Sequence, residues 1–427
     1  MLTGLIAAAM IVAARRKNAI LYVIAIHSVY SGIPLLLDVL TGAPTYGSFA
    51  GLRAAAFDEQ TSFVYVIYAC ACPVLWWLVG RGTTGSGSRA SERIRTIDRS
   101  ERLVKIVLWG FLISPIFFVF FAPDPTFYLS YGRITGIGVK HQDIILYHGM
   151  VNVMSTAAIC VGPLLLTLSR SSVWLQIGVS AQMVIAAWLN GKRFIVALAL
   201  LLLFLVTAQR NTRKRTKLFI TGFAIVVLVG GFAVAYQLVV RNYTMQNPER
   251  VYDSLRVDFG RDRSIKLAIY RELYPEAGPI LEYRGQSALF PFVSVIPRSI
   301  WPGKPWPYYV YFTSAALQMY GQKYIDWGMT TSWLDEAIAN FGIAGFLIGP
   351  LLLAWICRLA DRSKFAPFQI LSVTVCALIL SVDVSAWLLI AAMWVALLLL
   401  MRLDTKVVRV PGRGYATRRI RSVESTC

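Results

Sequence analysis

Residues 366–401 read APFQILSVTVCALILSVDVSAWLLIAAMWVALLLLM, and Asp383 is their one charged side chain. A helix needs about 20 apolar residues to cross the ~30 Å hydrocarbon core of a bilayer. This stretch is too long for one straight crossing, and Ser381, Val382 and Asp383 form its natural turning point. The segment therefore predicts two membrane-spanning helices joined by a tight hairpin.

Similar apolar stretches recur along the 427-residue chain, which is 57% hydrophobic and only 15% charged, with a mean hydropathy of +0.59. Soluble domains carry about 25% charged residues, so this composition excludes a soluble enzyme and a disordered protein. We expect an all-α polytopic membrane protein. It should contain about eleven transmembrane helices, at residues 2–14, 19–40, 62–80, 103–122, 144–168, 172–190, 194–208, 218–240, 337–357, 366–382 and 384–401.

The basic residues give an orientation for these spans. Alternating the eleven spans places every basic cluster on one face, which then carries 26 Lys and Arg against 6 Asp and Glu, whereas the rest of the chain carries 16 of each. Basic residues mark the cytoplasmic side of a membrane protein. The net charge of +20 is therefore a topology signal that faces anionic membrane lipids, and it requires no nucleic acid partner. The clusters are 15–17, 81–105, Arg170, 210–217, 358–364 and 402–427.

The same alternation divides the chain into four parts. Residues 1–240 form an N-terminal bundle of eight spans, and residues 337–401 form the C-terminal transmembrane helices. Between the eighth and ninth spans lies one large external loop, residues 241–336. Residues 402–427 form a basic cytoplasmic tail.

The sequence offers few residues for a metal site and no motif for a nucleotide site. The three histidines are scattered, and the six cysteines lie in apolar runs or at the extreme C-terminus. A P-loop, a GxSxG elbow, an HExxH motif and a Rossmann fingerprint are all missing. We expect neither a metal nor a cofactor.

The large loop has a composition typical of a ligand-binding surface, with 11 Lys and Arg and 18 aromatic residues in 96 positions. Aromatic rings stack on sugars, and arginine matches phosphate oxygens. Residues 284–306 read RGQSALFPFVSVIPRSIWPGKPW, whose prolines favour a rigid extended path that holds Arg298 and Lys304 for a polyanion; the alternative is a structural re-entrant loop. Residues 249–273 predict a surface helix across the mouth of the bundle.

Two further charged pairs stand at span ends. Asp335 and Glu336 begin the ninth span, where acidic side chains either complement the helix dipole or accept a proton from a sugar hydroxyl. Lys192 and Arg193 occupy an external hinge, Asn190 to Phe194, where basic residues are disfavoured. They either extend to the interface or bind an external phosphate, and we favour phosphate binding.

The order of these features resembles the Wzy-type O-antigen and oligosaccharide repeat-unit polymerases of bacterial inner membranes. It consists of the GKR hinge (191–193), the IPRSIWPGKP stretch (296–305) and the acidic span start that leads to NFGIAG (340–345). The resemblance implies a GT-C-like, metal-independent glycosyltransferase of the inner membrane. It further implies undecaprenyl-diphosphate-linked oligosaccharides as substrates, polymerised at the periplasmic side into O-antigen, capsule or exopolysaccharide, and a chain-length regulator as a partner.

Transfer of a sugar from a diphosphate develops negative charge on the leaving group, which fixed cations stabilise. We therefore assign Arg193 and Arg298 as catalytic, and Glu336, or else Asp335, as the group that orients or deprotonates the acceptor hydroxyl. Supporting contacts to the diphosphate are assigned to Lys192, Lys304, Arg241 and Arg284, and sugar stacking to Trp301, Trp306, Tyr308 and Tyr309.

Three rival functions share parts of this pattern. An O-antigen ligase of this general type relies on a histidine in the large loop, and residues 241–336 contain none. A GT-C transferase that uses a polyprenyl-phosphate sugar has an acidic pair in its first external loop, and Asp58 and Glu59 are the candidates here. A non-catalytic flippase or exporter of lipid-linked glycans should concentrate cations within its spans, whereas the spans of this chain contain few.

Overall fold

The structure is a computed structural model. It describes residues 19–47, 49–80, 98–130, 134, 142–168, 173–210, 216, 220–225, 227–228, 230–231, 252–253, 256, 260–294, 296–319, 328–363 and 365–407. Over these residues all regular elements are helical. The predicted spans 2–14 and 218–240 lie wholly or largely outside the described residues.

Five helical stretches are long and apolar enough to cross a membrane. They are Ala19–Thr41, Glu59–Gly80, Tyr147–Leu168, Val173–Asn190 and Trp333–Arg362. The first comprises α2 (Ala19–His27), the π-helical turn η1 (Ser28–Gly32) and α3 (Ile33–Thr41), and the last comprises α17 (Trp333–Phe341), η5 (Gly342–Ala344) and α18 (Gly345–Arg362). The others are α5 (Glu59–Gly80), most of α9 (Gln142–Leu168) and α10 (Val173–Asn190). An all-α multi-pass membrane protein is thereby confirmed, while the count of eleven spans stays a prediction.

Four more helices coincide with predicted spans. They are α6 (Asp98–Phe120), α11 (Arg193–Arg210), α19 (Ala366–Ser381) and α20 (Val384–Val407). Their apolar parts are shorter than 18 residues. The chain turns between Ser381 and Val384, so the helix break in residues 366–401 lies where the sequence predicts it.

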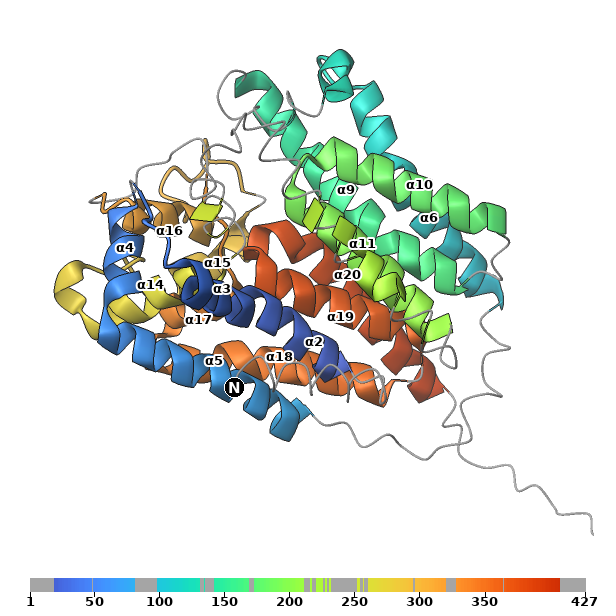
Figure 1. Ribbon diagram of the computed structural model, residues 1–427. Coiled ribbons are helices and arrows are strands. Elements are labelled where there is room, and N and C mark those ends of the chain that lie inside the picture. The colour runs from blue at the N-terminus through green and yellow to red at the C-terminus, as the bar shows by residue number, and fades with distance from the viewer. Residues whose placement is uncertain are drawn as a thin grey trace, which may run out of the picture.

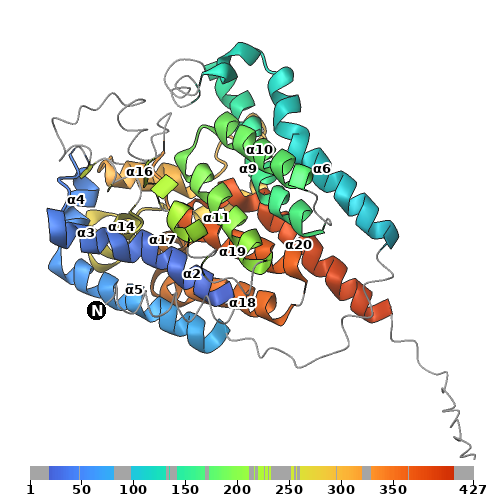
Figure 2. The same ribbon diagram turned by 45° about the vertical axis from the view of Figure 1, so that its right-hand side comes forward.

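The centre of the bundle is α19, which is buried along almost its whole length. It packs against α2, α9, α11, α18 and α20, while α6 and α10 pack on the outer side of α9 (Figure 1). The turned view in Figure 2 shows the same helices running side by side through the molecule.

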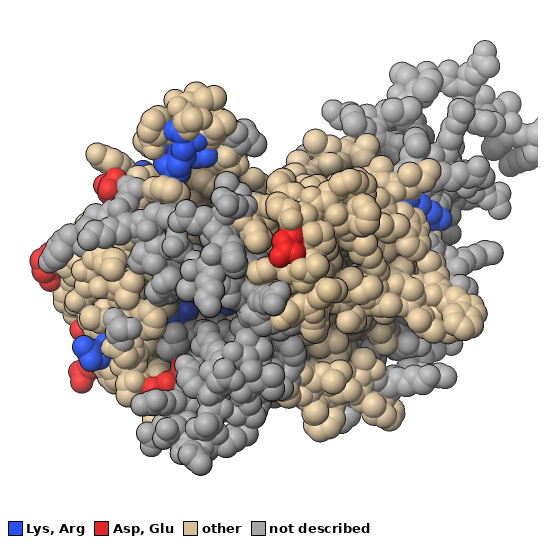
Figure 3. Space-filling model, turned by 90° about the horizontal axis from the view of Figure 1, so that it is seen from above, with Lys and Arg blue, Asp and Glu red and all other residues tan. Residues whose placement is uncertain are grey.

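The outer surfaces of the long helices are apolar. Phe63 and Leu78 on α5 and Trp174 and Val184 on α10 are each more than half exposed. In the view of Figure 3 the described surface is broken by few charged side chains. Such surfaces are stable against lipid rather than water, which agrees with a protein that crosses the membrane several times.

Short helices from distant parts of the sequence gather at one end of the bundle (Figure 1). They are α4 (Ala50–Phe57), α14 (Asp262–Leu273), α15 (Gln286–Val293) and α16 (Tyr308–Ala316), and they surround the beginning of α17. The end of α20 lies at the opposite end of the molecule (Figure 2). Most of the described part of the predicted large loop is therefore packed structure at one end of the bundle.

Two expectations for this loop are wrong. The prediction of a surface helix over 249–273 fails in its second half, because α14 is buried from Asp262 through Ile269, packed against α4, α5 and α17; most of 249–259 lies outside the described residues. Asp262, Arg263 and Lys266 look solvent-exposed in the sequence, yet all three are buried. The extended path also fails over 286–293, where α15 continues through Pro291, because proline removes only one backbone donor and α15 is short.

Candidate functional site

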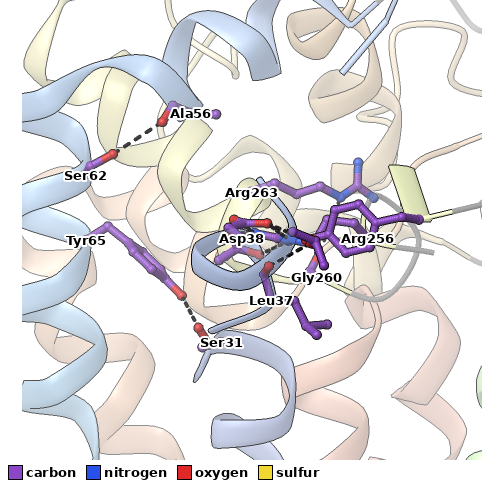
Figure 4. Close-up of polar contacts among 12 residues, drawn as sticks. Ser31, Leu37, Asp38, Ala56, Ser62, Tyr65, Arg256, Gly260 and Arg263 are labelled. Carbon is purple, nitrogen blue, oxygen red and sulfur yellow. Dashed lines mark hydrogen bonds and ion pairs between the residues drawn. The ribbon is translucent and has the colours of Figure 1, made fainter. Parts of the chain in front are cut away.

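A π-helical turn in the helical stretch Ala19–Thr41 accepts hydrogen bonds from two other parts of the chain. The wider turn at Ser28–Gly32 leaves backbone carbonyls available for other partners. The carbonyl of Tyr30 accepts the backbone N–H of Arg261 at 3.0 Å, and the carbonyl of Ser31 accepts the hydroxyl of Tyr65 at 3.2 Å (Figure 4). The turn thereby joins the start of α14 and the first half of α5 to the helical stretch Ala19–Thr41.

Arg256 is the centre of a buried ion cluster (Figure 4). Its guanidinium donates to both carboxylate oxygens of Asp38 at 2.7 Å, and to those of Asp262 at 2.7 and 2.6 Å. Burial opposes the charge of Arg256, but the two carboxylates raise its pKa well above the ordinary value. Gly260 lies so close to this guanidinium that a Cβ would displace it. The cluster ties the end of α3 to the start of α14.

Three more cations lie on the same short segment, and all are at most 8% exposed. Arg261 donates to the carbonyl of Ser381 at 3.0 Å, and Arg263 reaches the sulfur of Met329 at 3.8 Å. The ammonium of Lys266 lies 5.6 Å from the centre of the Tyr65 ring, and burial lowers its pKa. These cations were missed in the sequence because the segment was interpreted as a surface helix. The signal that could have revealed them is RDRSIK (261–266), a run of charged residues followed directly by the apolar Leu267, Ala268 and Ile269.

Asp335 acts as a helix cap. Its carboxylate accepts the backbone N–H of Ser332 at 2.8 Å and also the Ser332 hydroxyl, while the Ser332 side chain caps α17 in return. The hydroxyl of Ser264 donates to the same oxygen at 3.0 Å, which links α14 to α17. The helix-start interpretation of Asp335 is thereby confirmed.

Glu336 has a different environment from its neighbour. It is 1% exposed and its Oε1 accepts the Ser287 hydroxyl at 2.9 Å, while Oε2 has no hydrogen-bond partner among the described residues. Asn340 donates to Ser287 at 2.8 Å and accepts the backbone N–H of Ala288 at 3.2 Å. Glu336 and Asn340 together hold α15 against α17.

The GKR hinge joins α10 to α11, and the side chain of Lys192 is exposed there. Gly191 adopts φ +70° and would place a Cβ against Ile134, so the tight turn requires glycine. The side chain of Arg193 and the whole of Arg241 lie outside the described residues.

A pocket of about 630 Å³ opens between α15 and the chain that leads to α16. Five residues assigned to substrate binding or catalysis line it together: Arg284, Arg298, Trp301, Lys304 and Trp306. Tyr283 and Tyr311 add two more rings and Glu282 adds a carboxylate. Its lining thus combines aromatic faces with cations and hydrogen-bonding groups, which is typical of a site for a polar ligand with flat faces.

Arg298 and Lys304 use their donors within the loop. The Arg298 guanidinium donates to the carbonyls of Pro302, Lys304 and Pro305 at 3.2, 2.7 and 3.0 Å, and it stacks 3.3 Å from the centre of the Trp306 ring. Lys304 is 8% exposed and donates to the carbonyls of Ser294 and Ile296 at 3.1 and 2.6 Å. These two cations hold the proline-rich chain in shape and fix the orientation of Trp306.

Arg284 has its guanidinium turned outward. Its side chain is 61% exposed, it pairs with Glu272 at 2.9 Å, and it lies against Gly342 of the NFGIAG motif. Among the described cations that line the pocket, Arg284 is the one whose guanidinium is bound by no backbone carbonyl in the structure. It can therefore contact a phosphate or carboxylate of a ligand directly.

The remaining aromatic candidates divide between the pocket and the core. Trp301 is exposed at the pocket wall, and Trp306 is half-buried under Arg298. Tyr308 is 1% exposed, and its hydroxyl donates to the carbonyl of Asp335 at 3.4 Å. Tyr309 is half-buried and its ring packs against Gly328. The structure therefore brings two of the four rings to the pocket and places Tyr308 in the core.

The described residues contain no group of three or more His, Cys, Asp or Glu side chains arranged to hold a metal ion. Comparison with family models, with curated proteins and with solved structures finds no match to this chain. The proposed function therefore rests on the geometry of the pocket and its lining residues.

Proposed function

We propose that this protein is a membrane glycosyltransferase that polymerises lipid-linked oligosaccharide repeat units into a surface polysaccharide. The observation that carries the proposal is the pocket at one end of the bundle, which joins the aromatic face of Trp301 to the outward guanidinium of Arg284. Aromatic faces recognise sugar rings and a guanidinium recognises a diphosphate. Undecaprenyl-diphosphate-linked glycans contain both sugar rings and a diphosphate.

In the proposed reaction, the bond between the anomeric carbon of the growing glycan and its diphosphate oxygen breaks. A bond forms from that carbon to a hydroxyl oxygen of the next repeat unit, whose proton passes to water or to the leaving diphosphate. The leaving diphosphate keeps the bonding electrons, so a fixed cation beside it stabilises the transition state. The exposed guanidinium makes Arg284 the leading candidate for this contact, with Arg193, Lys192 and Arg241 as further candidates.

The contacts of Arg298, Lys304 and Glu336 favour supporting roles for these residues. Arg298 and Lys304 shape the pocket wall through backbone carbonyls, and Arg298 orients Trp306. Glu336 lies behind α15 and fixes it through Ser287, one residue from the pocket-lining Gln286. We therefore propose that these three side chains are positioning residues, in place of the catalytic role that the sequence suggested for Arg298 and Glu336.

The rival functions are less well supported. Residues 241–336 hold no histidine for a ligase. In the acidic pair of the first loop, Asp58 accepts the N–H of Thr61 at 2.7 Å and the hydroxyl of Tyr274 at 3.0 Å, as a helix cap does. A flippase would require translocation, whereas the pocket lies in the loop at one end of the bundle. We place the loop on the periplasmic face of the bacterial inner membrane, with a chain-length regulator as a partner.

Deletion of the gene tests this function. Surface glycans of the deletion strain should collapse to a single repeat unit on the acceptor, and the wild-type gene should restore the ladder of longer chains. Complementation with Arg284→Ala should not restore the ladder, although immunoblots of the membranes show normal protein. Long polymer that stays on the lipid carrier would indicate a ligase instead, and an unchanged ladder would contradict the proposal.

A further inference from the structure

Four exposed apolar side chains on α15 and on the chain that follows it form what we term the apolar rim: Leu289, Phe292, Ile300 and Trp301. Phe292 is 80% exposed and Ile300 is 75% exposed. Leu289 and Phe292 are three residues apart on α15 and share one face, and Leu289 and Trp301 both line the pocket. Exposure of large apolar side chains to water is unfavourable, so a rim of this kind indicates a partner.

The position of α15 indicates what that partner is. Glu336 and Asn340 hold α15 against α17, and α17 is the first part of the membrane span Trp333–Arg362. The turn at Gly342, which has φ +58°, ends α17, and α17 then packs back against the first turns of α18, where Leu334 and Ala337 lie against Gly349. α18 alone has 18 residues and is about 27 Å long at 1.5 Å per residue, which is close to the ~30 Å hydrocarbon core, so its first turns and the α17 packed on them lie near the headgroup boundary.

Exposed side chains of η5 and α18 support the same depth. Ile343, Leu347, Leu351 and Trp355 follow one another at intervals of four, and all are exposed. This apolar stripe begins directly after α17 ends at Phe341. The apolar surface of the span is therefore continuous along the chain with the segment to which α15 is fixed.

We propose that the apolar rim inserts into the boundary between the headgroups and acyl chains of the membrane leaflet on its own side. The rim itself carries no charged side chain, and tryptophan and other aromatic side chains are favoured at this boundary. Arg284, at the pocket, is largely exposed and lies against Gly342, at the turn before α18, where it can face the phosphate layer. This contact goes beyond the proposed reaction and does not depend on it. Its consequence is a pocket that opens at the surface of the bilayer, within reach of a lipid-linked ligand.

Site-specific labels test the insertion. Replacing Cys70 and Cys427 by alanine leaves Cys72, Cys160, Cys357 and Cys376, which are buried and protected from labelling. Into this background we would introduce Phe292→Cys, Ile300→Cys or, as a water-exposed control, Glu276→Cys, and attach an environment-sensitive fluorophore in phosphatidylcholine nanodiscs. Each variant is first checked for a monodisperse elution profile and for an unchanged thermal transition.

Doxyl-labelled phospholipid should quench more than half of the emission at positions 292 and 300 and little at position 276, with the opposite order for aqueous iodide. Equal iodide quenching at all three positions, with no doxyl effect at 292 and 300, would overturn the proposal. A second measurement needs no cysteine: Trp301→Phe should remove part of the tryptophan emission that brominated lipids quench. An unchanged quenchable fraction would also overturn it. Neither result depends on glycan synthesis, so failure here is distinguishable from failure of the proposed function.

Discussion

The guanidinium of Arg284 lies directly against the Cα of Gly342, so that a Cβ at Gly342 would overlap it. Gly342 also adopts φ +58°, a backbone conformation that L side chains rarely adopt. Two independent constraints therefore favour glycine at this position of the NFGIAG motif. The turn after α17 sets the place of the cation that we propose for diphosphate binding.

Gly342→Ala should lower both stability and activity. The strained φ costs about 1–2 kcal/mol, and the added methyl group must displace the Arg284 side chain from the pocket. Thermal unfolding in detergent measures the first effect, and the glycan ladder measures the second. Gly178→Ala is the matched control, because a Cβ at Gly178 meets no atom within 4 Å. Normal activity of Gly342→Ala would show that the position of Arg284 is unimportant.

Arg256→Gln should be among the most destabilising single substitutions in the chain. It leaves the carboxylates of Asp38 and Asp262 near each other without the guanidinium that both bind. Removing one partner of a buried pair costs about 3–5 kcal/mol, which should appear as a large drop in the thermal transition. Arg53→Ala, at an exposed position on α4, is the control. An unchanged transition in Arg256→Gln would contradict the ion cluster.

Asp58 should contribute stability that depends on pH. Slight burial raises its pKa, but hydrogen bonds from Thr61 and Tyr274 outweigh this and hold the pKa below its ordinary value. A carboxyl group with a depressed folded-state pKa stabilises the protein above its unfolded pKa and loses that effect as the pH falls through the folded-state pKa. Wild type should therefore be more stable than Asp58→Asn at pH 7, and the gap should close below about pH 4.

The same variant separates two functional interpretations. Because Asp58 caps α5 and lies outside the pocket, Asp58→Asn should keep a normal glycan ladder. Loss of all polymer in Asp58→Asn, with normal protein levels, would favour the polyprenyl-phosphate-sugar transferase.

The sequence predicted the helical membrane fold well, because runs of apolar residues report directly on the bilayer. The apolar runs also predicted the break between Ser381 and Val384. The proline-rich segment 284–306 predicted a shared site for Arg298 and Lys304, and both line one pocket with Trp301. Composition could not show which groups accept the hydrogen bonds of these cations. Arg298 and Lys304 are cations in the sequence, yet backbone carbonyls use their donors.

Burial of charge was equally hidden from the sequence. Charged residues on a helix predict solvent exposure unless their partners are known, and the partner of Arg256 on α3, Asp38, is 218 residues away. The cap role of Asp335 could be foreseen from Ser332 three residues earlier, because a capping box is local. Long-range pairs such as Arg256 and Asp38 can be identified only in the folded structure.

Glu336 should show the behaviour of a positioning residue. Glu336→Gln keeps an oxygen that accepts the Ser287 hydroxyl, so α15 should stay in place and much of the activity should persist. Glu336→Ala loses that contact and should lose the ladder. A residue that deprotonates the acceptor hydroxyl would fail in both variants, so an inactive but folded Glu336→Gln would restore the catalytic role to this carboxylate.

The most direct test of the proposed function uses the purified protein. Lipid-linked glycans extracted from the deletion strain are added to nanodiscs that contain wild type, Arg284→Ala or the exposed control Arg53→Ala, and the products are separated on a gel. We expect wild type and Arg53→Ala to convert single units into a ladder with release of the lipid diphosphate, and Arg284→Ala to leave single units. Absence of a ladder with folded wild type, or a full ladder with Arg284→Ala, would contradict the account.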